Sequence, residues 1–171
     1  SGEYALLSNQ GSDGFVVAQS GRLDTPVLES VLADIDFDGD QDLIYSDQSN
    51  LAWAKNDGSN GFIPQVPIES GIGEVASIEV GDFDNDGQVE IIITRTGDNM
   101  NEEPGLPWDQ TNFYRDWSIQ ILKLDGEYFR DATSSFIDVY SGNEGWIRFT
   151  KIKDIDNDGI LELYNTSNPY T

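Results

Sequence analysis

Polar and apolar positions alternate along the chain in short runs that are typical of β-strands. In VASIEVGD, which begins at residue 75, Ala76, Ile78 and Val80 fall on one face of an extended segment. Short β-branched or aromatic runs recur in DLIYS, EIIIT and SIQILKL. Turn sequences rich in glycine separate them, namely NDGSNG, SGIG, LDG and SGNEG. No long amphipathic helix competes with this pattern, so it predicts an all-β fold.

Two short motifs repeat along the chain. An acidic nonapeptide occurs three times, as DIDFDGDQD from Asp34, DFDNDGQVE from Asp82 and DIDNDGILE from Asp154. A second motif occurs as NQGSDGF at 9–15, NDGSNGF at 56–62 and, in degenerate form, KLDGEYF at 123–129. The first two acidic copies begin 48 residues apart, and the first two copies of the second motif 47 residues apart. Such periods in β-rich sequence predict propeller blades of about four antiparallel strands each.

The motifs divide the chain into blades if the acidic loop joins the first and second strands and the second motif joins the third and fourth. We then expect half a blade at 3–26, a whole blade at 27–73, a second at 74–141 with an insert at 97–117, and half a blade at 142–171. This amounts to about three blades, whereas closed rings have about four to eight. The rest of a longer chain, or a second copy in a homodimer, is expected to complete the propeller.

Each acidic nonapeptide places carboxylates at positions 1, 3, 5 and 9. These residues are Asp34, Asp36, Asp38 and Asp42; Asp82, Asp84, Asp86 and Glu90; and Asp154, Asp156, Asp158 and Glu162. Alternate side chains in a tight loop can converge on one point, and a glycine at position 6 permits the turn. The position 7 carbonyl can add another oxygen. Hard oxygen ligands in this number suit Ca²⁺, which accepts six to eight of them.

Two other interpretations of the acidic loops fit less well. An EF-hand needs a bidentate glutamate at position 12 and flanking helices, but position 12 is Tyr45, Ile93 or Asn165 and the flanks are predicted strands. Ordinary Asp-Gly turns would bind no ion. Three copies with one carboxylate spacing are difficult to explain by turn preference alone, so the sequence favours metal sites.

These loops and the NxGSxGF hairpins resemble the FG-GAP or VCBS repeat family, the calcium-loop blades of integrin α-subunit propellers and many secreted bacterial proteins. The resemblance implies that carboxylates at positions 1, 3, 5 and 9 bind about three Ca²⁺ ions, with carbonyls from Asp40, Gln88 and Ile160. It also implies an extracellular or cell-surface location. Two loops depart from the family by carrying Glu at position 9, which affects denticity. Integrin-like ligand recognition is not implied.

The composition restricts the remaining function classes. The chain has 32 acidic and 9 basic residues, a net charge of −23, which would repel nucleic acid and anionic membranes. No apolar run approaches the ~18 residues of a membrane span, so no membrane insertion is expected. Histidine and cysteine are absent, which excludes a Ser-His-Asp triad and a cysteine nucleophile. No carboxylate pair stands out from the abundant acids, so we expect no enzymatic activity.

The insert at 97–117 is the main candidate for ligand recognition. Its aromatic residues, Trp108, Phe113, Tyr114 and Trp117, can stack on sugars or anchor a protein, although they can equally cap the hydrophobic face of the blade. Trp53 is expected in the core between blades. The leading functional prediction is a non-catalytic, calcium-binding extracellular module that binds a protein or glycan. The alternatives are the propeller of a secreted polysaccharide-degrading enzyme and a structural spacer in a surface protein.

Overall fold

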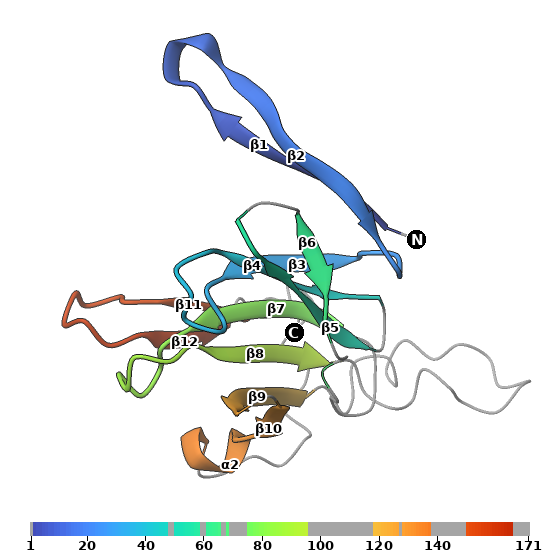
Figure 1. Ribbon diagram of the computed structural model, residues 1–171. Coiled ribbons are helices and arrows are strands. Elements are labelled where there is room, and N and C mark those ends of the chain that lie inside the picture. The colour runs from blue at the N-terminus through green and yellow to red at the C-terminus, as the bar shows by residue number, and fades with distance from the viewer. Residues whose placement is uncertain are drawn as a thin grey trace, which may run out of the picture.

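The all-β prediction is confirmed by two four-stranded antiparallel sheets and two β-hairpins (Figure 1). The computed structural model describes residues 2–47, 50–58, 61–65, 68, 75–95, 118–126, 128–137 and 150–165. Helical structure in this part is limited to the single turns η1 (Gly11–Asp13) and α2 (Thr133–Phe136). None of the described helices is long and apolar enough to cross a membrane.

The two four-stranded sheets are antiparallel meanders, in which each strand pairs with the next along the chain. The first consists of β3 (Glu29–Ala33), β4 (Asp42–Ser46), β5 (Leu51–Asn56) and β6 (Phe62–Pro64). The second consists of β7 (Val75–Gly81), β8 (Glu90–Arg95), β9 (Ser118–Asp125) and β10 (Tyr128–Asp131). We call these sheets blade 1 and blade 2.

A two-stranded hairpin stands at either end of the described chain. The first pairs β1 (Gly2–Asn9) with β2 (Phe15–Leu23), and the second pairs β11 (Thr150–Lys153) with β12 (Glu162–Asn165). The NQGSDGF motif joins β1 to β2 as NDGSNGF joins β5 to β6. The third acidic loop joins β11 to β12 as the other two join β3 to β4 and β7 to β8. The hairpins therefore correspond to different halves of a blade.

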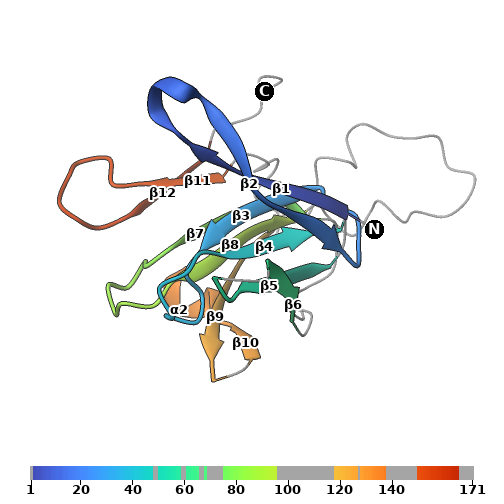
Figure 2. The ribbon, with the colours of Figure 1, turned by 45° about the horizontal axis from the view of Figure 1, so that its top comes forward.

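The core lies on both faces of the second strand of blade 1. Every residue of β4 is buried, and successive side chains of a strand point to opposite faces. Ile44 joins the cluster shared with blade 2, where it packs with Ile91 and Ile93. Leu43 and Tyr45 join a second cluster on the side of the β1–β2 hairpin. Blade 1 therefore packs against blade 2 through one face and against the β1–β2 hairpin through the other (Figure 2).

The hairpins expose apolar side chains that the complete blades bury. Ile35, at position 2 of the first acidic loop, is 1% exposed, whereas its counterpart Ile155 is 56% exposed. Phe62 closes the NDGSNGF motif at 8% exposure, whereas its counterpart Phe15 is 67% exposed. Within the described residues, β12 pairs only with β11. The hairpins thus have the surfaces of blades that lack their neighbouring strands.

Candidate metal centres

The three acidic loops leave their blades at a common end, on the left of Figure 1. We call them loop 1 (34–42), loop 2 (82–90) and loop 3 (154–162). Loops 1 and 2 are close neighbours, because Asp36, Phe37, Asp86 and Leu124 line one hollow of about 490 Å³. The stacking of the blades therefore gathers these carboxylates at one end of the molecule.

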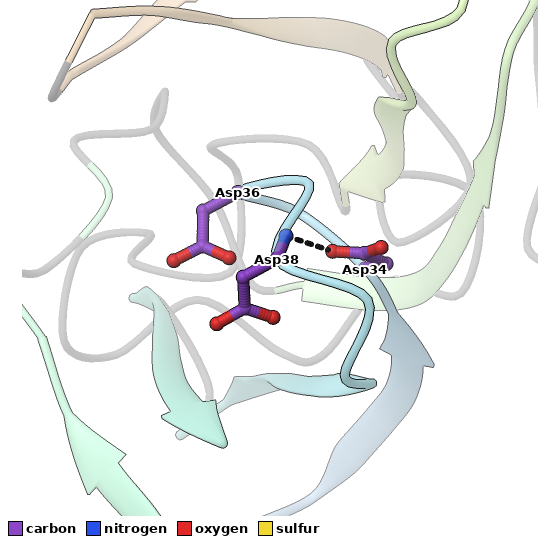
Figure 3. Close-up of side chains that lie close together, drawn as sticks. All are labelled: Asp34, Asp36 and Asp38. Atoms are coloured by element: carbon purple, nitrogen blue, oxygen red, sulfur yellow. Dashed lines mark hydrogen bonds between the residues drawn. The ribbon is translucent and has the colours of Figure 1, made fainter. Parts of the chain in front are cut away.

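The carboxylate at position 1 organises each loop by accepting two backbone hydrogen bonds. In loop 1, Asp34 accepts the N–H of Asp38 at 3.1 Å, the dashed line of Figure 3. It also accepts the N–H of Gly39 at 3.1 Å. In loop 2, Asp82 accepts the equivalent bonds at 3.1 and 2.9 Å, and in loop 3 Asp154 accepts them at 3.1 and 3.0 Å. The same side chain at the same position thus folds each loop in the same way.

The position 5 carboxylate closes the next turn of the loop. Asp38 accepts the N–H of Asp40 at 3.0 Å. Its counterparts in loops 2 and 3, at Asp86 and Asp158, accept the N–H of the position 7 residues Gln88 and Ile160 at 2.9 and 2.8 Å. The backbone at position 7 is therefore held beside the carboxylates in all three loops.

Left-handed backbone conformations occur at two positions of each loop. Glycine at position 6 has φ values of 95°, 89° and 89° in the three loops, which confirms its predicted role in the turn. Position 4 is also left-handed, with φ of 61° at Phe37, 56° at Asn85 and 62° at Asn157. Asparagine tolerates this region well, whereas phenylalanine adopts it at a cost.

Replacing Gly87 by alanine is expected to lower the free energy of unfolding by about 1–2 kcal/mol. An added Cβ would meet no heavy atom within 4 Å, so backbone strain at φ 89° is the cause. Urea denaturation measures the loss. Asn85→Gly is the control, because it keeps the left-handed conformation accessible and should change stability little. An alanine variant as stable as wild type would contradict the left-handed conformation of Gly87.

Carboxylate oxygens converge within each loop. One oxygen from each of three side chains lies within 4.8 Å of the others in the groups Asp34, Asp36 and Asp38; Asp82, Asp84 and Asp86; and Asp154, Asp156 and Glu162. In Figure 3 the carboxylates of Asp36 and Asp38 lie side by side and point the same way. Asp36 Oδ1 is buried and has no hydrogen-bond partner in the part of the chain that the structure describes. Convergent, all-oxygen donors fit a hard divalent cation such as Ca²⁺.

The position 9 carboxylate differs between loops because Glu is one methylene longer than Asp. In loop 1, Asp42 accepts the N–H of Ile35 at 3.1 Å and the N–H of Asn56 at 2.8 Å, so both its oxygens are engaged by the backbone. In loop 2, Glu90 Oε2 accepts the N–H of Phe83 at 2.9 Å, and Oε1 lies 3.0 Å from Lys123 Nζ. Glutamate therefore keeps one oxygen that no backbone N–H engages, whereas both oxygens of aspartate are engaged.

Loop 3 uses its glutamate in a similar way. Glu162 Oε2 accepts the N–H of Ile155 at 2.7 Å, and the side chain also contributes an oxygen to the loop 3 group. Burial raises the pKa of Asp42 and Glu90, whereas Glu162 is only partly buried. The difference between Asp and Glu at position 9 is visible in the sequence. Which of their oxygens the backbone engages depends on the pairing of the strand that position 9 begins.

Two lysines that the sequence did not single out reach into loops 1 and 2. Lys123 Nζ lies 2.8 Å from Asp84 Oδ2, 2.6 Å from Asp86 Oδ2 and 3.0 Å from Glu90 Oε1. Lys55 Nζ forms ion pairs with Asp36 and Asp38, the latter at 2.9 Å. A sequence signal exists, because each lysine stands two residues before an Asp-Gly pair, in KNDG and KLDG.

The lysines and the carboxylates of loops 1 and 2 shift each other's pKa toward the charged form. Hydrogen bonds to Asp36 and Asp38 raise the pKa of Lys55. Burial disfavours the charge of Lys123, but its three carboxylate partners outweigh burial and raise its pKa. The lysine hydrogen bonds in turn lower the pKa of Asp38 and Asp86. Each lysine and the position 5 carboxylate of its loop therefore stabilise each other's charged form.

The predicted aromatic site lies outside the described residues, as does the rest of the 97–117 insert that carries Trp108, Phe113, Tyr114 and Trp117. Trp53, by contrast, is described, and its predicted place between blades is confirmed. It is partly buried against the shared core and makes an edge-to-face contact with Phe129 of blade 2, with ring centroids 6.4 Å apart.

The meander sheets and repeated loops define a class of protein, namely a module of β-propeller-like blades. A family model described as an FG-GAP-like repeat matches residues 5–93, more than half of the chain. The chain belongs to the FG-GAP-like repeat family, as the two repeated motifs indicated. The match includes most of the β1–β2 hairpin, all of blade 1, and loops 1 and 2. No curated protein and no solved structure was found to match the chain.

Proposed function

We propose that this chain is a calcium-stabilised propeller module whose three acidic loops each bind one Ca²⁺ ion. One observation carries the proposal: three carboxylates converge in each of the three loops, at one end of the stacked blades. Positions 1 and 3 take part in every loop, with position 5 in loops 1 and 2 and position 9 in loop 3. Ca²⁺ accepts irregular sets of six to eight oxygens, whereas Mg²⁺ requires near-octahedral geometry and keeps its water. Loops that combine several carboxylates with the position 7 backbone held beside them favour Ca²⁺.

The proposed role of the ion is structural. The carboxylates of loop 3, and those of loops 1 and 2 beyond the charge of their single lysine, repel one another without calcium. A bound ion removes this repulsion. Extracellular calcium modules bind with a Kd of about 10⁻⁴ to 10⁻³ M. At a tenfold excess of calcium over Kd, each site adds roughly 1.4 kcal/mol to the free energy of unfolding. Such affinities suit the millimolar calcium outside cells, which supports an extracellular or cell-surface location.

Isothermal titration calorimetry tests the proposal by counting the sites. We expect about three Ca²⁺ ions per chain for the wild type. The double variant Asp154→Asn with Asp156→Asn should lose one site, because it removes two of the three convergent carboxylates of loop 3. Asp13→Asn with Asp125→Asn is the matched control, since it makes the same change in net charge outside the loops. No calcium binding by the wild type would refute the proposal.

We also propose that the module is non-catalytic and presents a binding surface. The rigid, stacked blades support this, because such scaffolds position variable loops for recognition. The aromatic residues of the 97–117 insert give it the composition of a protein- or glycan-binding loop. The exposed apolar side chains of the two hairpins support a second kind of partner, namely further strands from a longer chain or from a second copy.

A further inference from the structure

We infer that Lys55 and Lys123 are built-in counter-cations that hold loops 1 and 2 together without calcium and are displaced when calcium enters. Loop 3 has no such lysine among the described residues and therefore binds calcium first. This inference rests on the proposed calcium function. It gives the three loops different calcium affinities, although their sequences are nearly alike.

The strand register brings each lysine to its loop. Lys123 on β9 pairs directly with Glu90, the position 9 residue of loop 2. In blade 1, the pairing of Leu43 with Ala54 places Lys55, the next residue of β5, opposite Asp42 at position 9 of loop 1. The third strand of each complete blade thus presents a lysine at the same place. Two independent occurrences at one register position indicate a repeated feature rather than a chance contact.

Lys123 occupies the place where the carboxylates of loop 2 converge. Its side chain is 10% exposed, and its ammonium contacts the carboxylates of positions 3, 5 and 9 within 3.0 Å. Lys55 is more accessible, at 33% exposure, and contacts only positions 3 and 5. The difference follows from position 9, because both oxygens of Asp42 accept backbone N–H groups. Loop 2 therefore holds its lysine more firmly than loop 1.

An ammonium group and a calcium ion cannot share these oxygens. Calcium would lie about 2.3–2.6 Å from the same carboxylates, which would bring the two cations to within a few ångströms of each other. Their repulsion at such a distance is large at the low dielectric of a partly buried site. Calcium binding must therefore break the lysine contacts. The free energy of those contacts stabilises the calcium-free loop and is subtracted from calcium affinity.

The difference between the loops would persist in a ring completed by a second copy. The β11–β12 hairpin supplies the first two strands of a blade, and β1 of the second copy would be its third strand. Ser8 of β1 stands where Lys55 stands in β5, immediately before the NxG sequence. Serine carries no charge to compete with calcium. The carboxylates of loop 3, including the glutamate oxygen of Glu162, would then depend on the ion alone for neutralisation.

The test combines calcium titration with thermal melts of Lys123→Met and Lys55→Met. Each variant should melt at a lower temperature than wild type in EDTA, and should bind calcium about tenfold more tightly at one site, since one lost ion-pair network of this kind corresponds to a factor of ten or more. Lys151→Met is the matched control, because Lys151 pairs with Glu79 outside the loops. It should leave both the weak and the tight calcium sites unchanged.

A second measurement uses the wild-type protein and does not depend on the folding of the variants. Reductive methylation with formaldehyde and a borohydride, read by mass spectrometry, reports how exposed and how basic each lysine is. Calcium should raise the labelling rate of Lys55 and Lys123 several-fold, while that of Lys151 stays constant. Labelling that is unaffected by calcium in a protein shown to bind it would overturn the displacement.

The two proposals fail in different ways. Three calcium sites with unchanged affinities in Lys123→Met and Lys55→Met would leave the calcium function standing and refute the role of the lysines. Failure of every form to bind calcium, including the wild type with an intact loop 3, would refute both. The expected order of filling is checked by the Asp154→Asn, Asp156→Asn variant, which should lose the tightest site of the wild-type protein.

Discussion

Replacing Glu90 by alanine is expected to lower the free energy of unfolding by about 3 kcal/mol in the absence of calcium. The side chain is completely buried. Its Oε2 accepts the N–H of Phe83 at 2.9 Å, and its Oε1 lies 3.0 Å from Lys123 Nζ. Truncation leaves a partly buried N–H without its partner, opens a space beside β9 and removes one of the three partners of a buried ammonium.

Urea denaturation in EDTA measures this loss, and two variants separate its causes. Glu90→Gln keeps the size and the hydrogen-bond acceptor but removes the charge, so it should cost less than Glu90→Ala. Glu162→Ala removes the equivalent side chain of loop 3, which is less buried and has no lysine partner among the described residues. It should have the smallest effect of the three. Equal losses at Glu90 and Glu162 would contradict the account of the buried network.

Replacing Ile44 by alanine is expected to cost about 3 kcal/mol of stability. Ile44 is completely buried in the middle of β4, where it packs in the cluster shared by blades 1 and 2. Close packing on both faces of this strand leaves little room for neighbours to collapse into the space. The loss should appear as a lower urea midpoint with an unchanged denaturant slope.

Ile63→Ala is the control for this core prediction. It removes the same atoms from the same blade, but Ile63 is 44% exposed on the short outer strand β6. The expected cost is below about 1 kcal/mol. Similar losses at Ile44 and Ile63 would mean that blade 1 is not held by stacking against blade 2, and would contradict the core described above.

The fold class was predictable because the repeats fix the strand order. The acidic loop and the NxGSxGF hairpin each join a defined pair of strands, and both motifs are local sequence features. The loop backbone was predictable for the same reason, since Asp34 and Gly39 act on residues within five positions of each other. Local hydrogen bonds and left-handed turns require particular residue types at fixed spacings, so they can be predicted from the sequence.

Contacts across strands were less predictable. Lys123 is separated from Asp84 by 39 residues, and their contact depends on the register of β9 against β8, which the intervening insert hides. The engagement of Asp42 by the N–H of Asn56 depends likewise on the pairing of β4 with β5. A difference of one methylene between Asp42 and Glu90 then decides which oxygens remain for an ion. Sequence spacing alone does not contain this information.

The central claim is that calcium stabilises the folded chain through the acidic loops. Thermal melts in EDTA, in 10 mM Ca²⁺ and in 10 mM Mg²⁺ test it most directly. We predict that calcium raises the Tm by about 3 °C for each filled site, since 1 kcal/mol shifts the Tm of a domain of this size by roughly 2–4 °C, and that magnesium has little effect. Identical melting temperatures in all three conditions would contradict the claim.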